Sequence, residues 1–253
     1  MNPAEYRRVY EAEEAQWWYS GMRAISQALL EEPLRNMADG RGAPAPRRLA
    51  LLDAGCGTGG NLAHLAAWGR AVGIDLSKDA LAFCRERGVA AARAGLLALP
   101  FPDGAFDGVT SFDVIYHAWV TDDRAAAREM ARVLRPGGLL FVRVPALSLL
   151  WGGHDVEVQS RHRYTRSELR ALFEDSGLEV RRITYGNFFL FPVLLLRRSL
   201  DRLTGRAGSD VGFLPAPLEW AFRRLLGLEA ALVRRGFSLP IGASVMALGQ
   251  KPA

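Results

Sequence analysis

The chain has 253 residues, of which 49% are hydrophobic and 23% are charged. This composition excludes a disordered chain and is sufficient for one large domain with a substantial core. The basic residues behind the net charge of +5 are almost all arginines, scattered without long runs, so we expect no nucleic-acid partner. Two cysteines exclude a disulfide framework and a zinc site, and they favour a reducing, cytoplasmic environment.

The sequence also lacks the signals of a membrane-spanning or exported protein. Its N-terminus has no apolar core of signal-peptide length. The most apolar stretch, residues 188–196, is too short to cross a bilayer, which requires about 20 residues. We therefore expect no transmembrane segment.

The chain begins with a helical region and continues as an alternation of strands and helices. Residues 1–37 have apolar side chains at helical spacing, such as Trp18, Met22, Ile25 and Leu29, and a Gly/Pro-rich linker follows at 40–46. Short apolar runs predict strands at 49–55, 71–77, 89–93, 106–113, 139–145 and 178–186. Helical patterns predict helices at 58–68, 79–87, 122–134 and 165–176.

Capping residues support two of these helices. Ser77 can cap the helix at 79–87, and Thr165 with Glu168 forms a capping-box pattern before the helix that ends at Gly177. The alternation predicts an α/β fold with a doubly wound, mostly parallel sheet and helices on both faces. A last strand is expected at 243–250, after two amphipathic helices around 190–203 and 217–235.

The strongest motif is a glycine-rich loop directly after the first strand. Gly55, Gly57 and Gly60 fit G-x-G-x-x-G, and Asp75 follows 20 residues after Gly55, as in dinucleotide-binding proteins. A carboxylate at Asp75 can accept hydrogen bonds from both hydroxyls of a ribose. Asp53 would repel a pyrophosphate but can hold the cationic end of an amino-acid ligand. An NAD-dependent oxidoreductase is therefore the alternative, and a ligand with an amino-acid end is favoured over a dinucleotide.

Four motifs in order carry a family resemblance. LLDAGCGTGGNL (51–62), VGIDLS (72–77), residues 99–118 and ARVLRPGGLLFVRVP (131–145) resemble the motifs of class I methyltransferases that use S-adenosylmethionine (SAM). The resemblance covers about 49–145. It implies a Rossmann-like sheet of seven strands with the last antiparallel, and SAM as cofactor across the carboxyl ends of the first strands.

The resemblance also implies where SAM binds. Asp53 and the loop glycines would surround its methionine part, Asp75 would bind the ribose, and Leu76 would pack on the adenine. Where relatives often carry an acid for the adenine amino group, this chain has Gly95, so backbone groups there would replace it. The full set of expected cofactor contacts in the core is Asp53, Gly55, Cys56, Gly57, Gly59, Asp75, Leu76, Gly95, Leu96 and Phe112, with Asp113 as the alternative to Phe112 at the methyl-transfer face.

The segment EEAQWWYSGMR (13–23) resembles a lid found in a subgroup of these enzymes. In that interpretation Trp18 faces the cofactor, Arg23 pairs with the SAM carboxylate, and Tyr19 contacts the acceptor. An ordinary amphipathic helix with aromatic core contacts is the alternative. The predicted organisation is a lid and linker at 1–46, a SAM-binding core at 47–186, a helical insertion at 187–240 and a final strand at 241–253.

Histidines are the natural candidates for a general base that accepts a proton from a hydroxyl acceptor. His117 follows the fourth strand, at the sheet edge where substrates bind, and Tyr116 beside it is a candidate acceptor contact. The polar loop at 151–165 supplies His154, expected as the base, and Asp155, expected to orient it. Further candidates in that loop are His162 as a catalytic residue and Arg163 and Tyr164 as acceptor contacts. The alternative is that Arg161, His162 and Arg163 only cap and brace the next helix.

The insertion supplies the last candidates. Asn187 and Phe188 follow the sixth strand near the site and are expected to contact the acceptor. The apolar residues of the insertion either form a small core or line a pocket for a lipid or apolar molecule. The basic amphipathic helix at 190–203 could also rest on a membrane surface.

The favoured interpretation is a SAM-dependent O-methyltransferase. Its acceptor would be a small natural product, a sugar or a lipid-linked compound, and no bound metal is expected. A non-catalytic SAM-binding module is the further alternative, because the position of the missing acid is occupied by Gly95.

Overall fold

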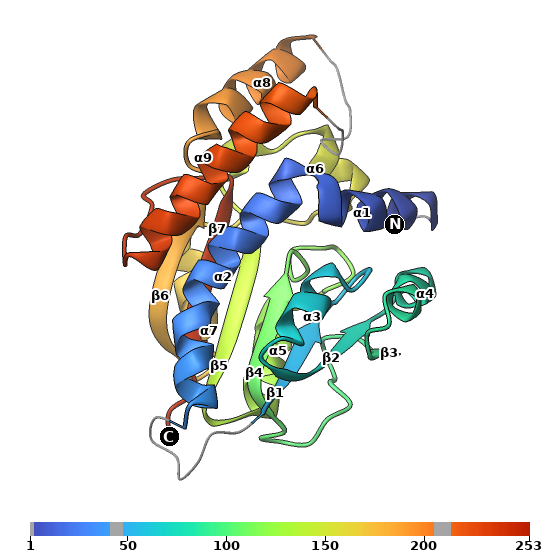
Figure 1. The fold of residues 1–253 in the computed structure, drawn as a ribbon, viewed down its shortest axis with the longest axis vertical. Coiled ribbons are helices and arrows are strands. Elements are labelled where there is room, and N and C mark those ends of the chain that lie inside the picture. Colours follow the sequence, from blue (N-terminus) through green and yellow to red (C-terminus); the bar gives the residue numbers. More distant parts are fainter. Residues whose placement is uncertain (1–2, 41–47, 205–213) are drawn as a thin grey trace.

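The computed structural model describes residues 3–40, 48–204 and 214–253. Its centre is a seven-stranded sheet in the order β3-β2-β1-β4-β5-β7-β6, in which β7 runs antiparallel to both of its neighbours and the other pairs are parallel (Figure 1). This confirms the predicted doubly wound sheet with an antiparallel last strand. The strands are β1 (Leu49–Ala54), β2 (Gly69–Asp75), β3 (Ala91–Arg93), β4 (Phe106–Phe112), β5 (Leu134–Pro145), β6 (Glu179–Gly186) and β7 (Ser244–Gln250).

Helices cover both faces of the sheet. In Figure 1, α2, α3 and α9 lie in front of the strands, whereas α5 and α7 lie behind them. The helices are α1 (Pro3–Ala15), α2 (Trp17–Ala38), α3 (Gly60–Leu65), α4 (Lys78–Glu86), α5 (Asp123–Val133), α6 (Gly153–Glu157), α7 (Arg166–Glu174), α8 (Phe191–Thr204) and α9 (Ala216–Arg234). The predicted linker at 40–46 lies, apart from residue 40, outside the described residues.

The predicted caps are present. The side chain of Ser77 accepts a hydrogen bond from the amide of Ala80 at the start of α4. At the start of α7, Thr165 and Glu168 form the reciprocal capping box, and Gly177 follows with a φ of 75°. Local side-chain hydrogen bonds therefore set the helix starts where the sequence indicated.

Two of the elements that differ from the prediction, α3 and α6, lie next to the site. The helix expected at 58–68 is the shorter α3, because Gly59 is left-handed, with a φ of 86°, and still belongs to the loop. The helix α6 was not predicted, since residues 151–165 were interpreted as a loop.

The packing of the first helices fixes the geometry of the site. Met22, Ile25 and Leu29, which were predicted to share one face, are buried in the main core. This anchors α2 along the sheet, and α1 then lies near α3 and α4, at the carboxyl ends of the first strands (Figure 1). The chain between β6 and β7 forms α8 and α9, as predicted, and α9 packs against α2.

Candidate functional site

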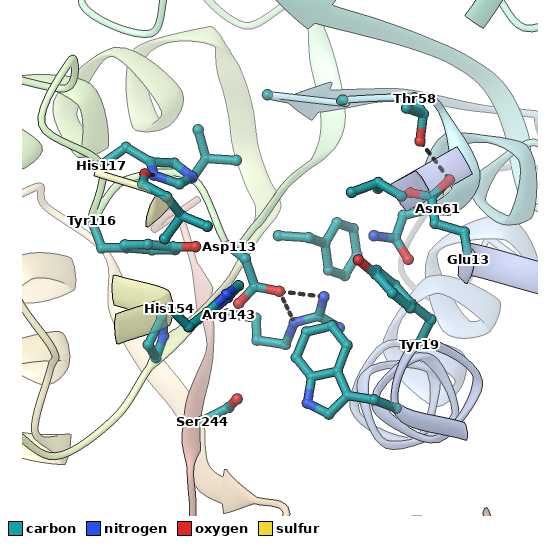
Figure 2. A pocket seen from close by; sticks show the side chains of 18 of the residues that line it. Glu13, Tyr19, Thr58, Asn61, Asp113, Tyr116, His117, Arg143, His154 and Ser244 are labelled. Carbon is teal, nitrogen blue, oxygen red and sulfur yellow. Dashed lines mark hydrogen bonds and ion pairs between the residues drawn. The ribbon is translucent and has the colours of Figure 1, made fainter. Parts of the chain in front are cut away.

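A single cavity of about 560 Å³ opens at the carboxyl ends of β1, β2, β4 and β5. Its walls come from the glycine loop, from α1 and α2, from the segments after β4 and β5, and from α8. Figure 2 shows Thr58, Asn61 and Glu13 on one side and Tyr116, His117 and His154 on the other. The topology therefore gathers residues from six parts of the chain around one space.

The glycine loop forms one wall, with its backbone in conformations that favour glycine. Gly55 has a φ of 85°, and a Cβ there would lie 2.5 Å from the Val114 side chain. Gly57 has a φ of 52°, and a Cβ there would meet no atom within 4 Å. Both line the cavity, as does Cys56, whose sulfur lies 3.9 Å from that of Cys84. The loop thus presents bare backbone to a ligand.

Asp75, at the end of β2, is held rigidly against this loop. One carboxylate oxygen accepts the amide of Gly57 at 3.0 Å, and the other accepts the amide of Ser77 at 2.8 Å. The pKa of Asp75 is raised by burial, and the backbone hydrogen bonds oppose this rise only in part. Each oxygen keeps a second lone pair, so the carboxylate could accept both hydroxyls of a ribose. Leu76 and Leu96 line the cavity beside it.

Asp53 lies at the floor of the cavity, on β1. Its side chain is buried and accepts a hydrogen bond from the Thr110 hydroxyl at 2.9 Å. Burial raises the pKa of Asp53 to about 7, against the opposing effect of the Thr110 hydrogen bond. A cationic ligand at this carboxylate would favour the ionised form and lower that pKa.

This raised pKa predicts a pH-dependent stability of the ligand-free protein. The folded state holds the Asp53 proton up to about pH 7, whereas the unfolded chain loses it near pH 4. The free energy of unfolding should therefore fall between these pH values by about 1 kcal/mol per pH unit from this group. Urea unfolding from pH 4.5 to 7.5 checks it, with Asp53→Asn as the comparison. An equally steep slope in Asp53→Asn would refute this origin.

The helix α1 is fastened over the glycine loop by Glu13. This buried carboxylate accepts hydrogen bonds from the Thr58 hydroxyl at 2.6 Å and from Arg87 at 2.7 Å. Arg23 donates to the Glu13 carbonyl oxygen at 2.8 Å, while its buried Nε has no hydrogen-bond partner. Arg23 lines the cavity together with Trp18 and Tyr19. The predicted lid residues therefore do face the cavity, and Arg23 could hold a ligand carboxylate.

A buried ion pair that the sequence did not reveal lies at the centre of the cavity. The Nε of Arg143, on β5, donates to the Asp113 carboxylate at 2.8 Å (Figure 2). The guanidinium lies near the rings of Trp18 and Phe112, at 5.5 and 5.2 Å from their centroids. Asp113 itself has a φ of 57°, which turns the chain sharply at the end of β4.

The far side of the cavity carries two histidines and an asparagine. The Nδ1 of His117 lies 2.8 Å from the Val158 carbonyl oxygen, and burial lowers the pKa of His117 to about 4, so its imidazole is neutral at pH 7. The Nδ1 of His154 and the Oδ1 of Asn187 are buried and have no hydrogen-bond partner. Glu229 accepts the amide of Phe189 at 2.9 Å and so holds the turn that presents Asn187. Buried polar atoms without partners suit a polar ligand.

The comparisons with known proteins identify the family. Residues 52–142 match the family model described as a methyltransferase domain. A demethylmenaquinone methyltransferase of Roseiflexus castenholzii is 38% identical over 232 residues, covering 86% of this chain and 87% of the relative. The chain belongs to the class I SAM-dependent methyltransferases. SAM is the cofactor of this family.

Other matches to this methyltransferase are shorter or more distant. A probable SAM-dependent methyltransferase of Mycobacterium tuberculosis is 38% identical over 140 residues, 53% of this chain and 50% of the relative. The chain thus spans about half the length of the first curated relatives it matches. Relatives matched over shorter stretches are named as tRNA methyltransferases. A possible histamine N-methyltransferase of Thermotoga maritima shares the fold, with a TM-score of 0.57, 19% identity and 97% of each chain covered.

Several residues of this methyltransferase differ from their predicted roles. Asp155 does not orient His154: its carboxylate accepts Arg163 at 2.8 Å and the amide of Gly152 at 2.8 Å. The orienting role was therefore wrong, and Arg163, expected at the acceptor, is half of a buried ion pair at the cavity wall.

Five other predicted residues do not line the cavity of the methyltransferase. Tyr164 donates its hydroxyl to Asp123, and His162 lies 3.9 Å from Glu168. His162 thus lies at the start of α7, as the alternative interpretation held, and Tyr164 joins the start of α7 to the start of α5. Phe188 packs on the hydrophobic core. Gly59 precedes α3 as its N-cap, and Gly95 leaves room for Leu76, which a Cβ there would approach to 3.3 Å.

The described residues contain no cluster of three potential metal ligands. In the same part of the chain, no helix combines the length and apolar character that crossing a bilayer requires.

Proposed function

We propose that this chain transfers the methyl group of SAM to a hydroxyl of a small-molecule acceptor bound in the same cavity. The observation that carries the proposal is the continuity of that cavity. One end is formed by the glycine loop and Asp75, and the other end by the unpartnered Nδ1 of His154 and Oδ1 of Asn187. Cofactor and acceptor would therefore meet in one enclosed space, as an in-line transfer requires.

We assign the residues of the cavity to cofactor binding, proton transfer and acceptor binding. Asp75 would hold the ribose, Asp53 the ammonium group and Arg23 the carboxylate of SAM, which supplies an electrophilic methyl group. His154 would accept the acceptor's proton at Nδ1 as the new oxygen–carbon bond forms and the sulfur–carbon bond breaks. His117 is a weak base, with a pKa of about 4, so we assign it to the acceptor wall. Asn187 would accept a second polar hydrogen from the acceptor.

Two alternatives are tested by the same experiment. A tRNA acceptor is suggested by relatives named as tRNA methyltransferases, which match 42% or less of this chain. NAD binding is disfavoured by the buried carboxylate of Asp53 in the cavity floor. A cytoplasmic location belongs to the proposal, since both cysteines are free thiols.

Calorimetry of the purified protein with SAM, S-adenosylhomocysteine and NAD is the first test. We expect both adenosyl ligands to bind in the micromolar range and NAD not to bind. Binding of NAD alone would overturn the proposal. Transfer of labelled methyl groups from SAM is then measured with a lipid extract, polar metabolites and bulk tRNA as separate acceptor pools. Label in either small-molecule pool supports the proposal, whereas label in tRNA alone, or in none, contradicts it.

A further inference from the structure

The helix α8 exposes apolar side chains to solvent and buries an arginine, whereas a helix packed on a protein core usually does the opposite. Four apolar side chains of α8 have large exposed fractions: Val193 53%, Leu196 62%, Leu200 51% and Leu203 83%. Arg198 on the same helix is only 6% exposed. Although Phe191 at its start is buried, α8 thus exposes four apolar side chains while it buries an arginine, the opposite of what burial of apolar residues alone would give.

These exposed residues form one continuous surface, which we call the α8 apolar face. Val193, Leu196, Leu200 and Leu203 recur at intervals of three and four residues, so they lie along one side of the helix. Leu149, in the short turn that contacts α8, is 43% exposed as well. Contiguous exposed apolar surface of this kind is typical of a docking site.

The helix also carries a basic balance of charge. It contains three arginines and one aspartate. The Arg197 side chain is half-exposed, and Arg202 reaches back to the carbonyl oxygens of Leu149 and Trp151. Basic residues flanking an apolar helix face match the anionic headgroups and acyl boundary of a lipid surface. A symmetric contact with a second copy would instead bring the arginines of two helices together.

The α8 apolar face is connected to the cavity through the same helix. Leu194, Arg197 and Arg198 line the cavity, and Leu150 lines it beside the exposed Leu149. In Figure 1, α8 lies at one extremity of the molecule, beyond the strand ends that form the cavity floor. A surface that contacted α8 would therefore lie beside the acceptor end of the cavity.

We propose that α8 docks the protein on an anionic membrane surface, so that an acceptor dissolved in the bilayer enters the cavity past α8. The apolar face would insert at the acyl boundary, and the exposed Arg197 and Arg202 would lie at the level of the headgroups. The entry of a lipid-soluble acceptor rests on the proposed methyl transfer, whereas the docking itself does not. The chemical class of the acceptor is then an apolar, bilayer-soluble hydroxyl compound.

Vesicle co-sedimentation of the full chain tests the docking. We expect binding to vesicles of phosphatidylglycerol and phosphatidylcholine, and at least about tenfold weaker binding to phosphatidylcholine alone or at 0.5 M salt. The double substitution L200E/L203E should weaken binding at least about tenfold. Phe237→Glu is the control, because Phe237 is 60% exposed, follows the C-terminal end of α9 and does not belong to the α8 apolar face; binding should persist.

The outcomes separate docking from methyl transfer. SAM calorimetry of L200E/L203E should give wild-type affinity, which shows that the variant is folded. If the wild-type protein binds SAM but does not bind anionic vesicles, the docking proposal is overturned and the proposed function is left intact. Vesicle binding without SAM binding would overturn the proposed function and leave the docking intact. A dimer that L200E/L203E dissociates, seen by analytical ultracentrifugation in the absence of vesicle binding, would assign the α8 apolar face to a second copy instead.

Discussion

Replacing Asp75 with Ala should weaken SAM binding at least about 100-fold while the protein stays folded. The carboxylate is preset by the amides of Gly57 and Ser77, and its remaining lone pairs would accept both ribose hydroxyls. A hydrogen bond to a charged group contributes about 1.5–3 kcal/mol, and 1.4 kcal/mol corresponds to a tenfold change in affinity. Two such bonds account for the expected loss, which calorimetry with SAM measures directly.

Two variants make this result specific. Asp79→Ala removes an exposed carboxylate four residues away, in the first turn of α4, and should leave the affinity within about twofold. Asp75→Asn keeps one acceptor oxygen and should fall between wild type and Asp75→Ala. Thermal unfolding of all three separates a lost contact from a lost fold. Wild-type affinity in Asp75→Ala would remove this residue from the cofactor site.

The wall of the cavity formed by the glycine loop and Asp75 could be predicted because its signals are local in the sequence. The loop from Asp53 to Gly59 is continuous, and Asp75 ends the next strand, so parallel pairing alone brings them to one edge. Whereas the antiparallel last strand was implied by the family resemblance alone, the same reasoning predicted the mostly parallel sheet and the helix starts at Ser77 and Thr165. In each case a few neighbouring residues determine the geometry.

The contacts that complete the site could not be predicted, because each joins residues that are far apart in sequence. Glu13 meets Thr58 across 45 positions, and Asp113 meets Arg143 across 30. Glu13 is one of several charged residues in α1, and the sequence does not show which residue its carboxylate will contact. Only the packing of α1 over the loop, and of β4 beside β5, brings these pairs together.

The orientation of α8 escaped prediction for a different reason. Helical periodicity shows that the segment has an apolar face and a basic face, but not which of them contacts the protein. The expected alternatives of a small core and a membrane contact therefore stayed open at 190–203. The exposure of Leu196 and Leu203, with Arg198 buried, is a property of the folded chain alone.

The pairing of His154 with Asp155 was mistaken because adjacency in sequence was taken for contact. In a helix, neighbouring side chains point about 100° apart, so residues i and i+1 do not face each other. Residues 153–157 form α6, where Asp155 instead turns back to the amide of Gly152 and toward Arg163. These contacts of Asp155 thus hold α6, the helix that carries His154.

Replacing Asp155 with Ala should lower the free energy of unfolding by about 3–5 kcal/mol, because it leaves the buried guanidinium of Arg163 without its carboxylate. The two side chains are 2% and 8% exposed, and two hydrogen bonds join them. The double variant D155A/R163M removes both charges and should recover most of the loss. Urea unfolding measures all variants, with Glu174→Ala, in an exposed pair with Arg170, expected within about 0.5 kcal/mol of wild type. An orienter of His154 would slow turnover without this loss of stability, so a stable Asp155→Ala protein would restore the catalytic interpretation.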